Sequence, residues 1–66
     1  MYTIVRKEGK VLVLDADSKP VYVSPEDAYL IHHGDVLGTE QIVVSRVKDL
    51  KDDQLLLALA KVVKLA

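Results

Sequence analysis

Residues 50–66 read LKDDQLLLALAKVVKLA, and this stretch decides most of the fold that the sequence predicts. Placed at about 100° per residue, its apolar side chains cover an arc of about 220°. An ordinary surface helix shows an apolar stripe little wider than about 100°. We therefore expect one long C-terminal helix, Leu50–Ala66, which packs on its own sheet with one side or is buried on two sides, by the sheet and by a partner helix.

The ends of this predicted helix carry charges that compensate the helix dipole. The acidic residues lie at its start and the basic ones near its end: Asp49, Asp52, Asp53, Lys61 and Lys64. Either Asp49 or Lys51 can fill the N-cap position. Lys51 in that position would let Leu50 and Leu55 pack together as a hydrophobic staple.

Chain length predicts a partner for this helix. A chain of 66 residues is marginally stable alone, and the usual remedies are disulfides, metal ions or oligomerisation. The chain has no cysteine, which excludes disulfides and thiolate metal sites. We predict a non-enzymatic module that forms a homodimer or docks on a larger protein. Its predicted interface consists of Leu55, Leu56, Leu57, Leu59, Val62 and Val63.

The first fifteen residues predict a hairpin. Two β-prone runs, Tyr2–Lys7 and Lys10–Asp15, flank Glu8-Gly9, and a two-residue loop ending in glycine suits a tight turn. The second run is apolar on both faces, which is typical of a central strand covered on both sides. The loop fixes the facing pairs Ile4–Val13, Val5–Leu12 and Arg6–Val11.

The middle of the chain predicts strand, helix and strand. Residues 20–23 read as a short strand that begins with proline. Ser24-Pro25-Glu26-Asp27 is typical of a helix start, and that helix would run to His33 and stop at Gly34. A loop over residues 34–40 and a strand over Gln41–Val47 follow. The predicted fold class is therefore α+β in β-β-β-α-β-α order: one domain, residues 1–66, with a small mostly antiparallel sheet, a short helix and the long C-terminal helix.

Composition narrows the function classes. The net charge of −1 means that the chain has no excess of basic residues for binding nucleic acid. The 50% hydrophobic content argues against disorder. Residues 50–66 are too short and too charged to span a membrane. No signal peptide is visible, so we expect a cytoplasmic location. The absence of Asn and Cys is typical of thermophile proteins, although Asp outnumbers Glu.

The residues that could carry chemistry are few. His32-His33 would close the first helix, where positive charge suits the dipole, and adjacent helical residues diverge too far to share a metal ion. The run Asp15-Ala16-Asp17 is similar to a calcium loop, but Lys19 and Pro20 stand where a ligand and a glycine are needed. We expect no catalytic residue, cofactor or metal. An enzyme would need a site between subunits, where one of these histidines meets a carboxylate of the other chain.

Five basic residues support an alternative function, a small dimeric regulator that binds nucleic acid. If the basic segments pair in the sheet, these side chains form one modest positive surface. They also fit a solvated sheet edge that lysine guards against aggregation. The predicted nucleic-acid contacts are Arg6, Lys7, Lys10, Arg46 and Lys48.

Parts of the chain resemble the swapped-hairpin AbrB/SpoVT-type DNA-binding dimers. Ser18–Glu26, Gly34–Leu37 and Ile42–Val44 match their strand, proline-led short helix, Gly-Asp pair and returning strand. The resemblance implies a dimer that binds DNA. Pro20 stands where that family has glycine, and the arginine after it is missing, so no residue roles are transferred. Residues 24–34 also resemble the capped helix in the N-terminal domain of tRNA-splicing endonucleases.

Overall fold

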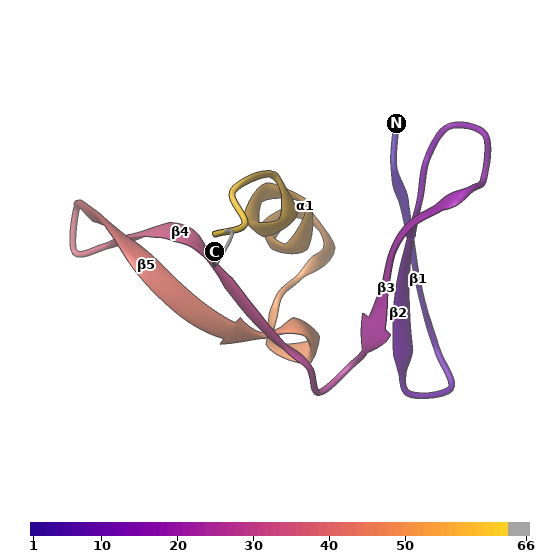
Figure 1. The fold of residues 1–66 in the computed structure, drawn as a ribbon, viewed down its shortest axis with the longest axis horizontal. Coiled ribbons are helices and arrows are strands. Elements are labelled where there is room, and N and C mark those ends of the chain that lie inside the picture. Colours follow the sequence, from indigo (N-terminus) through magenta and orange to yellow (C-terminus); the bar gives the residue numbers. More distant parts are fainter. Residues whose placement is uncertain (64–66) are drawn as a thin grey trace.

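The structure, a computed structural model, describes residues 1–63 of the chain. Within these residues it is a small α+β fold with five strands in two antiparallel sheets and one α-helix at the C-terminal end (Figure 1). The first sheet contains β1 (Thr3–Lys7), β2 (Lys10–Leu14) and β3 (Pro20–Pro25), in that order. The second contains β4 (Tyr29–Val36) and β5 (Thr39–Arg46), and a 3-10 turn (Val47–Asp49) leads from it to α1 (Asp52–Ala60).

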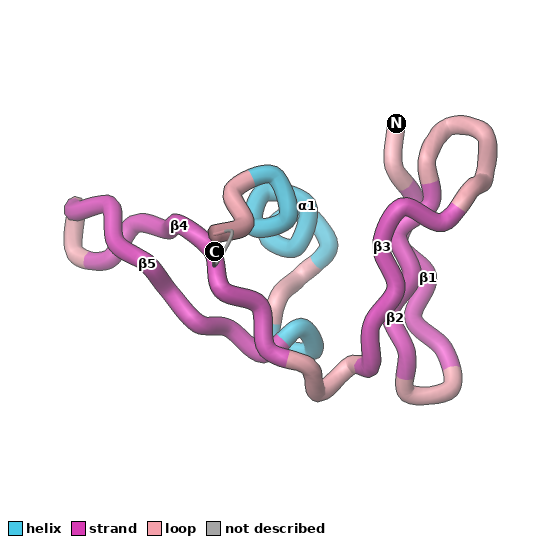
Figure 2. Tube along the Cα trace, viewed as in Figure 1, coloured by secondary structure: helices cyan, strands magenta, loops and turns pink. Residues whose placement is uncertain are grey.

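The two sheets form separate arms, and α1 lies between them (Figure 2). A short turn after Pro25 joins the arms at their base. Two backbone hydrogen bonds tie this base together, from Lys48 to Glu26 at 2.8 Å and from Val47 to Ala28 at 2.9 Å. These bonds join the two ends of the β4–β5 hairpin and extend its pairing into the turn between the arms.

The predicted N-terminal hairpin is confirmed, including its register. Ile4 faces Val13 and Val5 faces Leu12. The predicted third strand is also present and leaves β2 in the centre of its sheet. Cover on both sides of β2 is not found within the residues that the structure describes. Val11 and Val13 are fully buried, but Leu12 and Leu14 on the opposite face of β2 are only half-buried.

The predicted helix between Ser24 and His33 is wrong, because this segment forms the end of β3, a turn and the first half of β4. The Ser24 hydroxyl donates to the carbonyl of Pro25, 3.0 Å away, instead of capping a helix. The Glu26 N–H donates to the carbonyl of Gly9 at 2.8 Å. A helix of this length is marginal in water without tertiary support. Backbone pairing with distant strands therefore outweighs the local capping signal.

The predicted loop over residues 34–40 is also wrong. β4 continues to Val36, and the chain reverses through Leu37-Gly38, a two-residue turn in which both residues have positive φ. The predicted strand after it is present but begins earlier, at Thr39. Gly34, predicted to stop a helix, lies inside β4, where an added Cβ would approach a methyl group of Val43 to 3.3 Å. Glycine there leaves room for neighbouring side chains.

The predicted long C-terminal helix is wrong, and with it the predicted fold class, because α1 ends at Ala60. The chain then turns and runs antiparallel to β4. The N–H of His33 donates to the carbonyl of Lys61, and the N–H of Val63 donates to the carbonyl of Ile31, each at 3.0 Å. The helix stops because these residues pair with the second edge of β4. Residues 64–66 of the predicted helix lie outside the described residues.

The start of α1 matches one of the two predicted alternatives. Lys51 is the N-cap residue, and its N–H donates to the Gln54 side-chain carbonyl at 3.1 Å. Leu50 precedes the cap and packs against the cluster that contains Leu55, as a hydrophobic staple requires. Within residues 1–63, no helix reaches the length and apolarity needed to cross a bilayer.

The core lies where α1 meets the inner faces of both sheets. Its buried apolar residues come from both sheets, the 3-10 turn and the helix: Val11, Val13, Leu30, Val47, Leu55 and Ala58. Half-buried side chains, among them Ile4 and Tyr22, surround this cluster. One short helix therefore supplies the layer that both sheets share.

Two leucines of α1 give a matched test of this packing. Leu55 is fully buried and Leu57 is 64% exposed. Leu55→Ala should lower the free energy of unfolding by about 2–5 kcal/mol because it leaves a cavity in the core. Leu57→Ala should change it by less than about 0.5 kcal/mol. Urea unfolding at one fixed protein concentration measures both, and similar losses for the two variants would contradict the packing.

The turn residue Leu37 gives a second test. Its φ of 52° lies in the left-handed region, which costs a branched side chain roughly 1–2 kcal/mol. Leu37→Asn creates the Asn-Gly pair that such turns prefer and should raise the free energy of unfolding by about 1 kcal/mol. Val21→Asn, which also removes an exposed apolar side chain but from β3, should lower it. A gain in both variants would mean that apolar exposure, not backbone strain, is the cause.

Candidate functional site

The apolar residues predicted to form an interface on the C-terminal helix have different environments. Leu55 is fully buried in the chain's own core, and Leu56 and Leu59 are half-buried against it. Leu57 is exposed on the opposite side. Val62 is 42% exposed and bridges to His32 on the edge of β4. Val63 is half-buried and belongs to the same extended segment. Most of the apolar side chains of the helix therefore pack against the protein's own two sheets.

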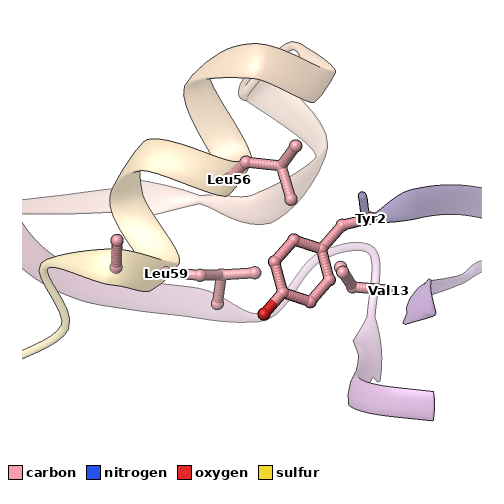
Figure 3. A pocket seen from close by; sticks show the side chains of 5 residues that line it. Tyr2, Val13, Leu56 and Leu59 are labelled. Atoms are coloured by element: carbon pink, nitrogen blue, oxygen red, sulfur yellow. The ribbon is translucent and has the colours of Figure 1, made fainter. Parts of the chain in front are cut away.

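Leu56 and Leu59 line a small cavity between α1 and the first sheet (Figure 3). Its volume is about 200 Å³, and Tyr2, Val13 and Ala60 complete the wall. The Tyr2 ring reaches from the N-terminal end of the first sheet towards Leu59 (Figure 3). The walls are apolar apart from the tyrosine hydroxyl, so the cavity offers no constellation of polar groups to fix a ligand.

The five predicted nucleic-acid contacts do not gather on one sheet. Arg6 and Lys48 line the same open groove, which Asp49 and Asp52 also line. Lys7 and Lys10 face each other at the end of the first hairpin. Arg46 lies at the end of β5 in the second sheet. The structure brings four of these residues together as two pairs and leaves Arg46 apart, and the nucleic-acid function stays a prediction.

Arg6 has partners inside the chain. Its guanidinium forms an ion pair with Asp52 at 3.1 Å and donates to the Leu50 carbonyl at 2.7 Å. Both contacts lie at the start of α1. Arg6 therefore ties β1 to the N-terminal end of the helix, and these donors are not directed at an external phosphate.

His32 and His33 lie on a strand instead of a helix end, so their side chains point to opposite faces of the sheet. His32 is buried and His33 is exposed. The His32 Nδ1 lies 3.1 Å from the carbonyl oxygen of His33, which can only accept, so Nδ1 carries the proton. In the neutral ring Nε2 then accepts the hydroxyl proton of Ser45, also at 3.1 Å.

A histidine that accepts a serine proton is the first requirement of a nucleophilic pair, but the remaining parts are not assembled around it. The third group is a backbone carbonyl instead of a carboxylate. The cleft beside His32, about 330 Å³, has Leu57, Lys61 and other residues in its wall but not Ser45. The pair instead satisfies two polar groups on the inner face of the sheet.

Metal ligands are not clustered either. In the part of the chain that the structure describes, no three His, Cys, Asp or Glu side chains lie close enough to hold a metal ion. Asp15, at the start of the calcium-like run, accepts hydrogen bonds from the N–H groups of Asp17 and Lys19 at 2.9 and 3.0 Å. One of its carboxylate oxygens therefore organises the turn.

The histidine–serine pair can be tested with a second serine as control. Ser45→Ala leaves the His32 Nε2 without its donor and should lower the free energy of unfolding by about 1–3 kcal/mol. Ser24→Ala should cost about 0.5 kcal/mol, because the Pro25 carbonyl that Ser24 contacts keeps the N–H of Ala28. Urea unfolding measures both. In ¹⁵N spectra the ring signals of His32 should shift only in Ser45→Ala, and equal effects of the two substitutions would contradict the pair.

The outer face of the β4–β5 sheet, which points away from α1, is uncovered within residues 1–63 and carries apolar side chains beside the exposed His33. Three of its side chains are well exposed: Tyr29 at 63%, Ile42 at 62% and Val44 at 59%. Ile31 is half-buried and lies opposite Val44. We call these four residues the outer patch. Acidic and basic side chains stand at its two ends.

The edge strand β5 differs from the two edge strands of the first sheet. β1 has five residues and carries Arg6 and Lys7, and β3 begins and ends with proline. Lysine, short length and proline are the features with which proteins protect sheet edges from further pairing. β5 has eight residues, TEQIVVSR, with neither lysine nor proline. Among the strands of residues 1–63, its free edge is therefore the one that is open to a further strand.

Arg46 and Tyr29 close one end of the outer patch. The Arg46 guanidinium lies 5.0 Å from the centroid of the Tyr29 ring and donates to the Tyr29 hydroxyl. That hydrogen bond raises the pKa of Arg46, so the guanidinium stays charged at every pH of interest. At the other end Asp35 and Glu40 face each other across the hairpin, two like charges in one cross-strand pair.

Sequence reasoning missed the outer patch because it assigned Tyr29 and Ile31 to a helix. A signal for the strand was present. Tyr29 and Ile31 are residue types that are common in strands, and Leu37-Gly38 offers a two-residue turn ending in glycine, as Glu8-Gly9 does. The capping pattern at Ser24-Pro25 was given more weight than either.

Comparisons of the chain with known protein families, with curated proteins and with solved structures find no match.

Proposed function

We propose that this protein is a non-enzymatic interaction module that works as a homodimer and associates through its β4–β5 sheet. The observation that supports the proposal is the outer patch, which lies beside an edge strand that is longer than β1 and β3 and has neither lysine nor proline. A contiguous exposed apolar patch on a small protein marks an interaction surface. The cytoplasmic location expected from the sequence is part of the proposal.

This surface replaces the helix as the proposed interface. Leu55 is fully buried and Leu56 and Leu59 pack on the core, so they are not free to meet a second chain. The β4–β5 sheet is different, since its outer face and one edge are both open. The protein's small core also favours association, because chains of about 60 residues bury too little surface to be more than marginally stable alone.

The mass of the protein in solution tests the proposal. Sedimentation at micromolar concentration should give twice the mass of 7.3 kDa calculated for one chain. Val44→Glu, which places a charge in the outer patch, should give the monomer mass. Val23→Glu is the matched control, because Val23 is a strand valine of similar exposure, 55% against 59%, on the other sheet.

Two results would contradict the proposal. One is a wild-type protein that stays monomeric at every concentration. The other is a dimer that Val23→Glu dissociates and Val44→Glu leaves intact, since the interface would then lie on the first sheet. Circular dichroism of each variant shows whether a change in mass comes from unfolding.

A further inference from the structure

The hydrogen bonds on both sides of β4 show which backbone groups of β5 point outward. The N–H of His33 and the carbonyl of Ile31 bond to residues 61–63 on the edge of β4 away from β5. In an antiparallel pair, residues that face each other direct their backbone groups the same way, both towards each other or both away. Ile31 faces Val44 and His33 faces Ile42. The N–H and carbonyl groups of Ile42 and Val44 therefore point out of the open edge.

By the same alternation, Glu40 and Arg46 also present their backbone groups at this edge. The four side chains concerned all lie on the outer face. β5 thus offers a pattern that reads acidic, apolar, apolar and basic along one edge: Glu40, Ile42, Val44 and Arg46.

This pattern is complementary to itself when the strand is turned around. If Val43 of two copies face each other in an antiparallel pair, Ile42 faces the partner's Val44 and Glu40 faces the partner's Arg46. Glu40, Ile42, Val44 and Arg46 all have outward backbone groups, so they form hydrogen-bonded pairs, whereas the two Val43 residues form a non-hydrogen-bonded pair. Shifting the register by one residue would oppose outward groups to inward ones. Shifting it by two would separate Glu40 from its counter-charge.

The charges favour this register further. Glu40 faces Asp35 within its own hairpin, an unfavourable pair of like charges. In the dimer, the partner's Arg46 would lie beside Glu40. The Tyr29–Arg46 pair of one copy would then be one strand spacing away from the acidic pair of the other. Arg46 has donors to spare, since the hydrogen bond to Tyr29 uses one of its five N–H groups.

The inner face of the joined strands is also compatible. There Gln41 would face the partner's Ser45, an amide beside a hydroxyl, and Val43 would face its own copy. On the outer face, Ile31 and Val44 of one chain would continue into the partner's Ile42. The two outer patches would then form one apolar strip across both copies.

We infer that two copies of this chain pair through β5, antiparallel with Val43 on the two-fold axis, to form a continuous four-stranded sheet. This inference rests on the proposed function and names its partner, a second copy, and its register. The dimer is isologous, because each Glu40–Arg46 contact occurs twice. No other edge strand of residues 1–63 has such a self-complementary row of charges.

A charge exchange tests the inference. Glu40→Arg and Arg46→Glu should each weaken dimerisation by about tenfold, because each places like charges in two symmetric pairs. The double variant Glu40→Arg/Arg46→Glu restores opposite charges and should return the dissociation constant to within about threefold of the wild-type value. Analytical ultracentrifugation gives the constants. Additive weakening in the double variant would overturn the register.

Single cysteines test the position of the axis, because the natural chain has none. The two Val43 Cα atoms would be about 4.5 Å apart in a non-hydrogen-bonded pair, within reach of a disulfide. Val43→Cys should therefore form a covalent dimer on mild oxidation. Gln41→Cys, on the same strand and face, should not, because its two copies would lie about 14 Å apart.

The outcomes separate this inference from the proposed function. A protein that is monomeric throughout overturns both. A dimer that Val44→Glu dissociates, but in which Val43→Cys does not cross-link and the charge exchange does not recover, overturns the register and leaves the proposed function standing. Cross-linking of Val43→Cys together with recovery in the double variant supports both.

Discussion

The backbone pairing of β4 is the constraint on which the rest of the structure depends. The N–H and carbonyl groups on each edge of a strand need partners, since unpaired backbone groups are costly once buried. β5 supplies one edge through a two-residue turn. Residues 61–63 supply the other, and the chain can reach that place only by ending α1 at Ala60. The length of the helix is thus set by a strand that lies far from it in sequence.

The same constraint places the core. With its last residues tied to β4, α1 lies against the inner face of the second sheet, and Leu55 and Ala58 reach the buried valines of β2. Arg6 fixes the other end of the helix to β1 through Asp52. The apolar arc of the helix, which is too wide for one sheet, is used on two sheets that meet it from different sides. A second helix is not needed to explain the arc.

Local signals predicted some parts of this fold and failed at others for a physical reason. The first hairpin followed from Glu8-Gly9, because its turn and its pairing are close in sequence. The wrong helix at residues 24–33 and the overlong one at residues 50–66 both involve segments whose hydrogen-bond partners are distant. Glu26 pairs with Gly9, and Lys61 pairs with His33. Capping patterns and helical periodicity describe only near neighbours, so they could not reveal these contacts. The outer patch was missed with the strand that carries it.

In a small chain with two sheets and one helix, the helix cannot cover every face of the sheets. Each sheet has two faces, and α1 lies on only one face of each, so Val23 on the first sheet and Val44 on the second remain in solvent. The two exposed faces differ in what their edges allow. Proline and basic residues restrict the edges of the first sheet, whereas β5 presents unpaired backbone groups beside apolar side chains. Adding a strand at an open edge satisfies the unpaired backbone groups and brings apolar side chains of neighbouring strands into contact. That combination makes the second sheet the stronger site for assembly, although the helix has the more hydrophobic sequence.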